Sequence, residues 1–518
     1  MLELIVAAAC CMPQDVTHRI ESICSRSNGV ARASVIGTSR GERPIHAIEI
    51  SAGTADTDAR PGILILAGAD GTRRIDTDLA LHHGARLVDD YLGGDETTKA
   101  LLESSVVWIV PLLNPDGAAL GRHGNATRLD LDRDGRFDED APRDVDGDGL
   151  VTFMRWEDPD GEWLVDPDEP RLMRKADRTA GERPTHAYAV KAQAADGHES
   201  RAEDDAQGVW IDRTLPHRWT AFDRRTGTFP SSEPETKALL DFVYARHNLV
   251  MAFVWGRDDN LLATPKVVKP KPRVQNDGIL EDDKPWFERA GKRYRELTER
   301  EGDSDPRFDG SPWCWLYLQV GVPTFASDVW RVPALEEEDA KDPLRLEKRR
   351  LARCERDEDG FASWHTFDHP ELGKVEVGGF TQTDPTDSID DEERAKAFDA
   401  HHAFVLEVAT WRPELRVASL LSKPLGDGAF EIEAVVANDG TLPAQTASAE
   451  RSRRFSVPRL VLSGAELLAG RDRERVENLA PYGTRKSFRW IVTGTAGTVV
   501  TLALTVDPVG SETRTVTL

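Results

Sequence analysis

VVWIVPLLNPDG, residues 106–117, carries the strongest structural signal in this chain. Its apolar part, Val106 to Leu113, ends directly in Asn114-Pro115-Asp116-Gly117, which are turn-forming residue types. A second apolar run, residues 62–67, precedes it and ends in the turn GADGTR, residues 68–73. Such strand patterns alternate with helical patterns along the chain, which predicts an α/β fold, a mixed β-sheet flanked by helices. We expect a ligand site at the carboxyl ends of the central strands.

A second motif, GTFPSSEPET, occupies residues 227–236. Ser232 followed three residues later by Glu235 has the spacing of a capping box, and Pro234 suits the first turn of a helix. We therefore expect a helix to begin here and to bury Leu239 and Val243.

With these motifs the chain resembles the zinc carboxypeptidase family, the carboxypeptidase A/B type. In that family the NPDG strand lies one strand after a Gly-x-His-x-x-Glu turn that supplies two zinc ligands. The segment IDRTLP, residues 211–216, resembles the family's Asn-Arg-Asn segment, which holds the substrate's terminal carboxylate. The matched segments cover roughly residues 30–410.

The resemblance also shows where this chain departs from the family at the metal. Asp70 stands at the His position of the turn, Arg73 at the Glu position, and Gly256 falls at the place of the third ligand. A catalytic zinc needs three ligands and an open position for water, and neither arginine nor glycine has a side-chain lone pair to offer. The sequence therefore predicts that no zinc binds.

Two further positions complete the implied site. Asp328 stands where the family has its general base Glu, one methylene shorter. Arg213 stands at the substrate-carboxylate position with Asp212 beside it, and the pair could either bind a carboxylate or neutralise itself.

Two functions remain open at this point. The favoured one is a zinc-free pseudo-peptidase that binds peptide or cell-wall-type ligands in the old active-site cleft. The alternative is an active metallocarboxypeptidase with atypical zinc ligands, for which His82 and His83 are the nearest candidates. The i, i+4 series of Leu79, His83 and Leu87 instead favours a packing role for His83.

Composition excludes several kinds of partner. The 518 residues contain 91 Asp and Glu against 66 Lys and Arg, a formal net charge of −25. Nucleic acid is therefore not an expected partner, since phosphate binding needs clustered basic residues. No stretch approaches the length of about 18–20 apolar residues that spans a membrane.

The N-terminus bears on localisation. Residues 1–11, MLELIVAAACC, read as the end of an export signal, as a lipid anchor at Cys10, or as a buried first strand. We expect a signal segment within residues 1–20 and an exported protein, periplasmic, secreted or lipid-anchored, without excluding a cytoplasmic one. Cys24, Cys314 and Cys354 show no metal-binding spacing.

An acidic insertion, about residues 125–205, separates the NPDG strand from Arg213. Asp144, Asp146 and Asp148 stand at the first, third and fifth positions of a calcium loop, but Arg155 replaces the closing Glu. A poorer copy contains Asp130, Asp132 and Asp134. The insertion is either a calcium site or a solvated acidic loop.

The chain changes character near Pro413, where short alternating strands begin. Residues 430–436 and 500–506 show a clear period of two. We expect a carboxypeptidase-like α/β domain over residues 21–412 and a C-terminal β-sandwich over residues 413–518.

Overall fold

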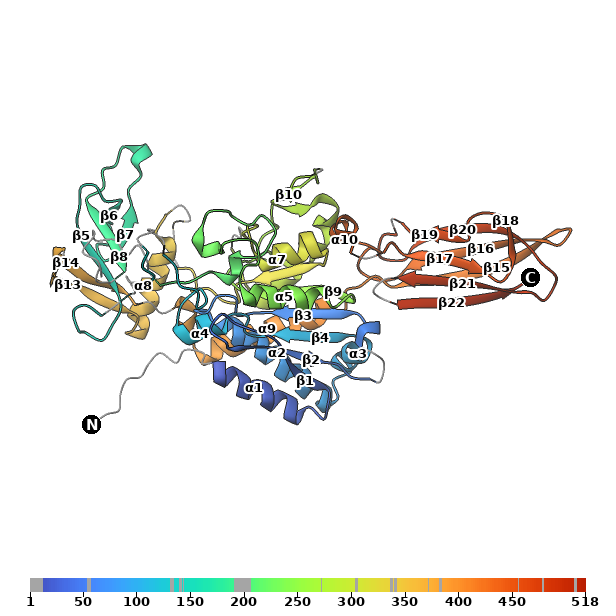
Figure 1. The fold of residues 1–518 in the computed structure, drawn as a ribbon, viewed down its shortest axis with the longest axis horizontal. Coiled ribbons are helices and arrows are strands. Elements are labelled where there is room, and N and C mark those ends of the chain that lie inside the picture. Colours follow the sequence, from blue (N-terminus) through green and yellow to red (C-terminus); the bar gives the residue numbers. More distant parts are fainter. Residues whose placement is uncertain are drawn as a thin grey trace.

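The computed structural model describes residues 13–53, 57–130, 135–138, 142, 144–190, 206–271, 273–302, 306–335, 339, 342–370, 372–381, 384–454, 456–477, 479–506 and 510–518. Figure 1 shows three parts in a row, with an accessory lobe at the left, an α/β domain in the middle and a β-sandwich at the right. Residues 1–12 of the expected signal segment lie outside the described residues. The remainder of that segment belongs to helix α1.

The α/β domain is built around a sheet in the order β1-β2-β4-β3-β9-β12. The strands β4, β3, β9 and β12 run parallel, whereas β1 and β2 are antiparallel to their neighbours. The elements of this domain are α1 (Pro13–Arg26), β1 (Ala31–Thr38), β2 (Pro44–Ile50), η1 (Thr57–Ala59), β3 (Gly62–Leu66), α2 (Arg74–Gly93), α3 (Glu96–Ser104), β4 (Val106–Val110), α4 (Pro115–Leu120), η3 (Ile211–Arg213), η4 (Arg224–Thr226), α5 (Pro234–Tyr244), β9 (Leu249–Trp255), β10 (Val267–Val268), β11 (Ile279–Leu280), η5 (Glu281–Asp283), α6 (Lys284–Thr298), α7 (Pro312–Trp315), the π-helical turn η6 (Leu316–Val320), β12 (Thr324–Ser327), η7 (Pro385–Ser388) and α9 (Asp391–Ala409).

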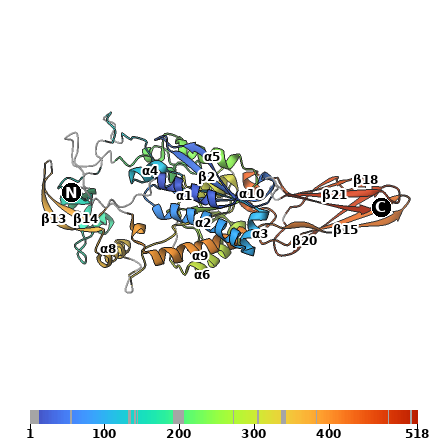
Figure 2. The ribbon, with the colours of Figure 1, turned by 90° about the horizontal axis from the view of Figure 1, so that it is seen from below.

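Helices cover both faces of this sheet because its strands are apolar on both sides. Every residue of β3 and β4 is buried. Trp108 of β4 packs edge-on against Phe242 of α5, while its neighbour Ile109 lies against Gly84 of α2. Successive side chains of a strand point to opposite faces, so α5 and α2 cover opposite sides. Figure 2 shows α1, α2, α9 and α6 together on the α2 side, consistent with the contacts between neighbours in that row.

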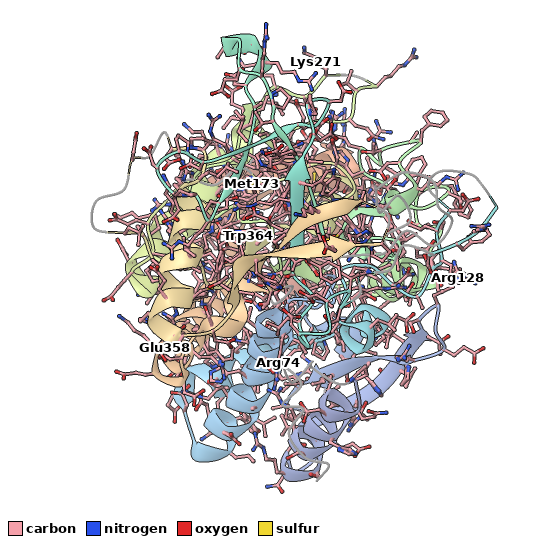
Figure 3. The ribbon with its side chains drawn as sticks, turned by 90° about the vertical axis from the view of Figure 1, so that its left-hand side faces the viewer. Arg74, Arg128, Met173, Lys271, Glu358 and Trp364 are labelled. Carbon is pink, nitrogen blue, oxygen red and sulfur yellow. The ribbon has the colours of Figure 1, made fainter. Side chains whose placement is uncertain are left out.

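The accessory lobe contains an antiparallel sheet that the sequence patterns did not predict. Its order is β13-β14-β5-β8-β6-β7, so strands of the acidic insertion pair with strands that follow the general-base position. Figure 3 faces this lobe, with Trp364 of β13 and Met173 of β7 near its centre. Its elements are β5 (Phe153–Glu157), β6 (Trp163–Val165), β7 (Met173–Lys175), η2 (Arg178–Ala180), β8 (His186–Val190), α8 (Arg345–Asp357), β13 (Phe361–His369) and β14 (Gly373–Phe380).

The C-terminal part consists of two antiparallel four-stranded sheets, as expected for a β-sandwich. Their alternating apolar residues, among them Ile432, Trp490 and Leu502, form a separate core. The elements are β15 (Leu415–Gly426), β16 (Ala429–Asn438), α10 (Ala447–Ser452), β17 (Arg459–Ser463), β18 (Glu466–Ala469), β19 (Arg473–Arg475), β20 (Thr484–Thr493), β21 (Val499–Val506) and β22 (Gly510–Thr517).

Helix α10 joins the sandwich to the α/β domain. The buried carboxylate of Asp283 accepts hydrogen bonds from the backbone N–H groups of Ala447 at 2.8 Å and Ser448 at 3.0 Å. It thereby satisfies donors at the start of a helix that would otherwise be left without partners. The two parts therefore meet through a buried polar contact in addition to their covalent connection.

Candidate functional site

The predicted site residues meet at the carboxyl ends of the parallel strands. Asp70 follows β3, Gly256 follows β9, and Asp328 follows β12. Parallel neighbours end at the same edge of a sheet, so these positions converge there. Figure 1 shows α4, which follows β4, at this edge, on the side of the accessory lobe.

Asp70 is ion-paired with a residue that the sequence analysis did not single out. The side chain of Arg257, next to Gly256, donates from Nε to Oδ2 of Asp70. The other oxygen of Asp70 accepts from the backbone N–H of Thr72 at 2.9 Å and from its hydroxyl at 2.7 Å. Arg257 also lies 3.4 Å from Asp384. Arg257, next to the implied third ligand position, is thus ion-paired with Asp70, at the implied first ligand position.

Arg73 is buried in the same region. Its guanidinium donates to both oxygens of Asp76, at 2.8 and 3.1 Å, and to the backbone carbonyl of Asp328 at 2.7 Å. Burial disfavours its charge, but Asp76, Asp384 and Asp328 hold the pKa of Arg73 above its ordinary value. Arg73 is therefore a fixed cation that bridges β12 and the start of α2.

Asp328, at the general-base position, is surrounded by cations. Its carboxylate is ion-paired with Arg300 and with Arg331. Burial would raise the pKa of Asp328, but these two arginines lower it below its ordinary value. A carboxylate held ionised in this way accepts a proton poorly, which is unfavourable for general-base catalysis.

Asp212 is paired away from its neighbour Arg213. Its two oxygens contact Nε2 of His123 at 2.7 Å and the guanidinium of Arg307 at 2.6 Å. Although burial would raise it, the pKa of Asp212 lies well below its ordinary value because of these partners. Arg307 also pairs with Asp258 at 3.1 Å. Asp212 is thus part of an internal ion-pair network.

Arg213 lies at the edge of this network without an ion pair of its own. Within the part of the chain that the structure describes, no carboxylate lies within 4.0 Å of it and its side chain makes no hydrogen bond. Its guanidinium instead stacks on the ring of Trp210, 4.3 Å from the ring centroid. Burial and the neighbouring Arg307 lower the pKa of Arg213.

The side chains of the NPDG motif make structural hydrogen bonds that hold the backbone around the site. Asn114 accepts from the N–H of Gly117 at 2.9 Å, which caps α4, and donates to the carbonyl of His123 at 2.9 Å. The buried Asp116 accepts from Ser39, the N–H of Gly41 and Arg43. The turn therefore fixes the backbone on which His123 stands.

The expected capping box at α5 is wrong. Glu233, not Ser232, precedes the first turn, and no side chain caps that end. Glu235 faces inward and accepts from the backbone N–H of Arg40 and from Asn125. The side-chain amide of Asn125 also donates to Glu233 at 2.8 Å. Glu235 is therefore held in this buried contact and does not cap the helix.

Comparison with known proteins identifies the family. Residues 17–301, more than half of the chain, match the model of the zinc carboxypeptidase family. The chain belongs to this family. Residues 414–517, which form the sandwich, match a domain of unknown function, DUF8731.

Three relatives show how little sequence this member shares with other proteins of similar fold or sequence. Carboxypeptidase SOL1 from Arabidopsis thaliana is 28% identical over 120 residues, which cover 23% of this chain and 24% of that protein. The structure of thrombin-activatable fibrinolysis inhibitor is 13% identical with a TM-score of 0.41, covering 77% of this chain and 73% of that one. Carboxypeptidase A from Helicoverpa armigera is 12% identical with a TM-score of 0.38, covering 65% of this chain and 69% of that one. The chain spans about a quarter of the length of the curated relative.

The residues at the three implied ligand positions of this family member do not fit a zinc ion. Gly256 has no side chain, Arg73 cannot coordinate, and Asp70 is paired with Arg257. Among the described residues, the acidic insertion is the one place where three or more His, Cys, Asp or Glu side chains lie close enough to share a metal ion.

The acidic insertion gathers Asp144, Asp146 and Asp148, whose nearest ligand atoms lie within 4.8 Å of one another. Asp144 accepts from the backbone N–H groups of Gly147 and Gly149, and His365 of the accessory sheet lies 3.2 Å from Asp146. Asp130 is described, but Asp132 and Asp134 lie outside the described residues. Calcium binding by this loop stays a prediction.

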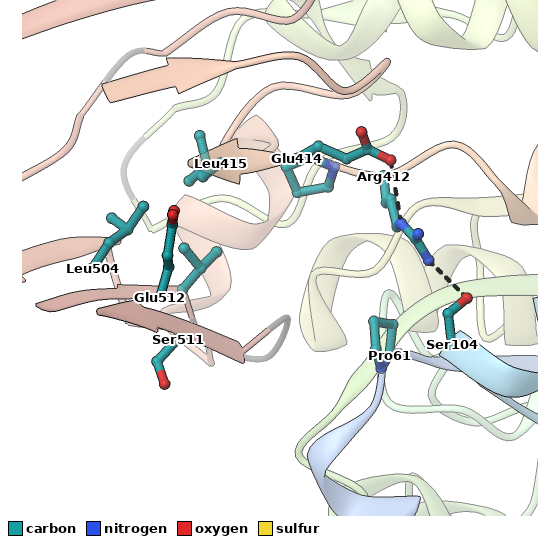
Figure 4. A pocket seen from close by; sticks show the side chains of 10 residues that line it. Pro61, Ser104, Arg412, Glu414, Leu415, Leu504, Ser511 and Glu512 are labelled. Atoms are coloured by element: carbon teal, nitrogen blue, oxygen red, sulfur yellow. Dashed lines mark hydrogen bonds and ion pairs between the residues drawn. The ribbon is translucent and has the colours of Figure 1, made fainter. Parts of the chain in front are cut away.

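The described residues also leave a cleft of about 320 Å³ where the sandwich meets the α/β domain. Figure 4 shows Arg412 between Ser104, to which it is hydrogen-bonded at 3.3 Å, and Glu414, which lies 3.6 Å away. It shares no residue with the network around Asp70. No helix in the described part of the chain is long and apolar enough to cross a membrane.

Proposed function

We propose that this chain is a zinc-free, non-catalytic member of the zinc carboxypeptidase family that binds peptides or cell-wall peptides by their terminal carboxylate. The observation that carries the proposal is the ion pair between Arg257 and Asp70, formed by the segments that should supply two of the zinc ligands. The proposal includes export of the protein, as its N-terminal sequence indicates.

Two arginines supply the positive charge that a zinc ion would provide. Removing a dication from a cleft that keeps several carboxylates would leave them repelling one another in a poorly solvated place. Arg73 and Arg257 supply the missing positive charge, through Asp76 and Asp70 respectively. A zinc ion would have to displace Arg257 and would lie near a second permanent cation.

Catalysis is opposed by the same network. Without zinc-bound water, hydrolysis would depend on Asp328 activating water alone, yet its carboxylate is held by Arg300 and Arg331. The lowered pKa of Asp328 makes it a weaker base than an unpaired carboxylate.

Ligand recognition by Arg213 is supported by its lack of an internal partner. Asp212, the nearest acidic residue in sequence, is occupied by His123 and Arg307. The planar guanidinium offers paired donors that suit a carboxylate, and stacking on Trp210 orients that plane.

Replacing Arg213 with alanine is expected to weaken binding of a peptide with a free C-terminus by about 10- to 100-fold, as for loss of a charged hydrogen bond. The amidated form of the same peptide should bind weakly to both proteins. Isothermal titration of both peptides against wild type and Arg213→Ala measures this.

Arg293→Ala is the matched control, because Arg293 lies on α6 and is already paired with Glu407 at 2.7 Å. Its affinity should equal that of wild type. Equal binding of the free and amidated peptides to wild type would reduce Arg213 to a structural residue. Chelator-sensitive hydrolysis of either peptide would instead favour the active metallocarboxypeptidase.

A further inference from the structure

A closed loop begins next to Arg213. The backbone N–H of Ser231 donates to the carbonyl of Thr214 at 2.8 Å, which brings the two ends of residues 215–230 together. A second bond, from the N–H of Trp210 to the carbonyl of Arg225 at 2.8 Å, ties the loop to the residue on which Arg213 stacks. Closed surface loops of this size frequently serve binding. We call this segment the 215–230 loop.

The outer part of the 215–230 loop is held by its own hydrogen bonds. The buried hydroxyl of Thr226 donates to the carbonyls of Thr220 and Asp223, both at 2.7 Å. The indole N–H of Trp219 donates to the carbonyl of Thr226 at 2.7 Å, and Asp223 caps η4. The tip of the loop is therefore a defined turn.

The 215–230 loop exposes two phenylalanines to solvent. Phe222 is fully exposed, at 102% of its reference surface, and Phe229 is 59% exposed. The backbone of Phe222 also has a φ of +68°, a left-handed conformation that is unfavourable for a bulky side chain. Exposure and backbone strain both destabilise the free protein, and no contact within the described residues offsets either for Phe222. Strained exposed residues of this kind are characteristic of binding sites.

We propose that Phe222 and Phe229 form a second contact for the ligand of Arg213, against an aromatic or aliphatic side chain upstream of the terminal carboxylate. This inference rests on the proposed function. The hydrogen bonds at Trp210 and Thr214, on either side of Arg213 in sequence, hold the 215–230 loop next to Arg213. We therefore expect the loop to contact the same ligand as Arg213. Aromatic rings supply large apolar contact at low entropy cost. The preferred ligand is therefore a peptide of several residues rather than a free amino acid.

The test uses hexapeptides of glycine and serine with a free C-terminus, one series carrying phenylalanine at one upstream position at a time. For wild type, the best phenylalanine peptide should bind about tenfold more tightly than the all-polar peptide, which is about 1.4 kcal/mol. Phe222→Asn should abolish this preference. Because asparagine tolerates a left-handed φ, the melting temperature of the Phe222→Asn protein should equal or exceed that of wild type.

Phe229→Ser provides a second variant without a change at a strained position, and it should reduce the preference as well. Leu421→Ser is the matched control, since Leu421 is 60% exposed but lies on the sandwich. It should keep the full preference.

The outcomes separate the two proposals. If wild type binds both peptide series equally and Arg213→Ala weakens both, carboxylate recognition stands and the role of the 215–230 loop is overturned. If wild type binds neither series, both proposals fail. If Phe222→Asn leaves peptide binding unchanged but abolishes self-association in sedimentation, the loop binds a second copy of the chain and this inference is wrong.

Discussion

Arg73→Met is expected to lower the free energy of unfolding by about 3–5 kcal/mol, the usual penalty for removing one partner of a buried ion pair. Asp76 is 1% exposed and takes two hydrogen bonds from Arg73. Burial already raises the pKa of Asp76 to about 6, so without the guanidinium its carboxyl group would have to take up a proton or stay charged without a partner. The carbonyl of Asp328 would also lose a donor. Guanidinium chloride unfolding of the full chain measures the change.

Two further variants identify the cause. Arg74→Met removes the neighbouring arginine, which is 38% exposed and 3.3 Å from Asp78, and should cost less than about 1 kcal/mol. Arg73→Met combined with Asp76→Leu should recover most of the loss, because no buried charge is left unpaired. An Arg73→Met protein as stable as Arg74→Met would contradict a charge-balanced network in the cleft.

Acid is expected to destabilise the fold through buried histidines of α2 and α9. His83 and His402 face each other with their Nδ1 atoms 3.2 Å apart, and His401 hydrogen-bonds Tyr294 at 3.0 Å. Burial lowers the pKa of His401 and of His402 to about 3, and that of His83 well below its ordinary value. Nearby carboxylates do not compensate, although Asp90 lies 3.6 Å from His402.

The sign follows from these lowered pKa values. Below about pH 6.5 the unfolded chain protonates its histidines while the folded chain does not, so stability is full above pH 6.5 and falls as the pH drops toward 3. Each buried histidine contributes about 1.4 kcal/mol per pH unit. Glu235 acts in the opposite direction, because burial raises its pKa to about 7.

His402→Gln isolates one of these contributions. The variant should show a pH dependence of unfolding free energy between pH 6.5 and 4.5 that is shallower by about 1.4 kcal/mol per pH unit. Identical slopes for wild type and His402→Gln would show that His402 titrates normally in the folded protein.

The sequence predicted the central part of the fold because its strands are distinctive locally. The apolar runs at residues 62–66 and 106–110 became parallel neighbours with their turns at one edge. The same pattern recovered the helix after Pro234 and the alternating strands of the sandwich. Leu79, His83 and Leu87 are buried, as their spacing indicated.

Ion pairs between residues that are distant in sequence could not be predicted from these local patterns. Arg257 follows Gly256 directly, but nothing local shows that its guanidinium reaches Asp70, 187 positions earlier. Arg73 pairs with Asp76, one helical turn away, and not with the carboxylate of Asp70 or Asp328. The accessory sheet was missed because strands β5 and β14 belong to segments more than 200 residues apart. Such contacts depend on tertiary packing, which periodicity does not encode.

Zinc content tests the central claim most directly. The full-length protein is dialysed against buffer containing trace zinc, and bound metal is measured by elemental analysis before and after chelation. We expect far less than one equivalent per chain, with no change in melting temperature on adding zinc, because Arg257 already occupies Asp70 and neither Arg73 nor Gly256 can coordinate. One equivalent of chelator-sensitive zinc, accompanied by cleavage of a hippuryl peptide, would contradict a zinc-free cleft.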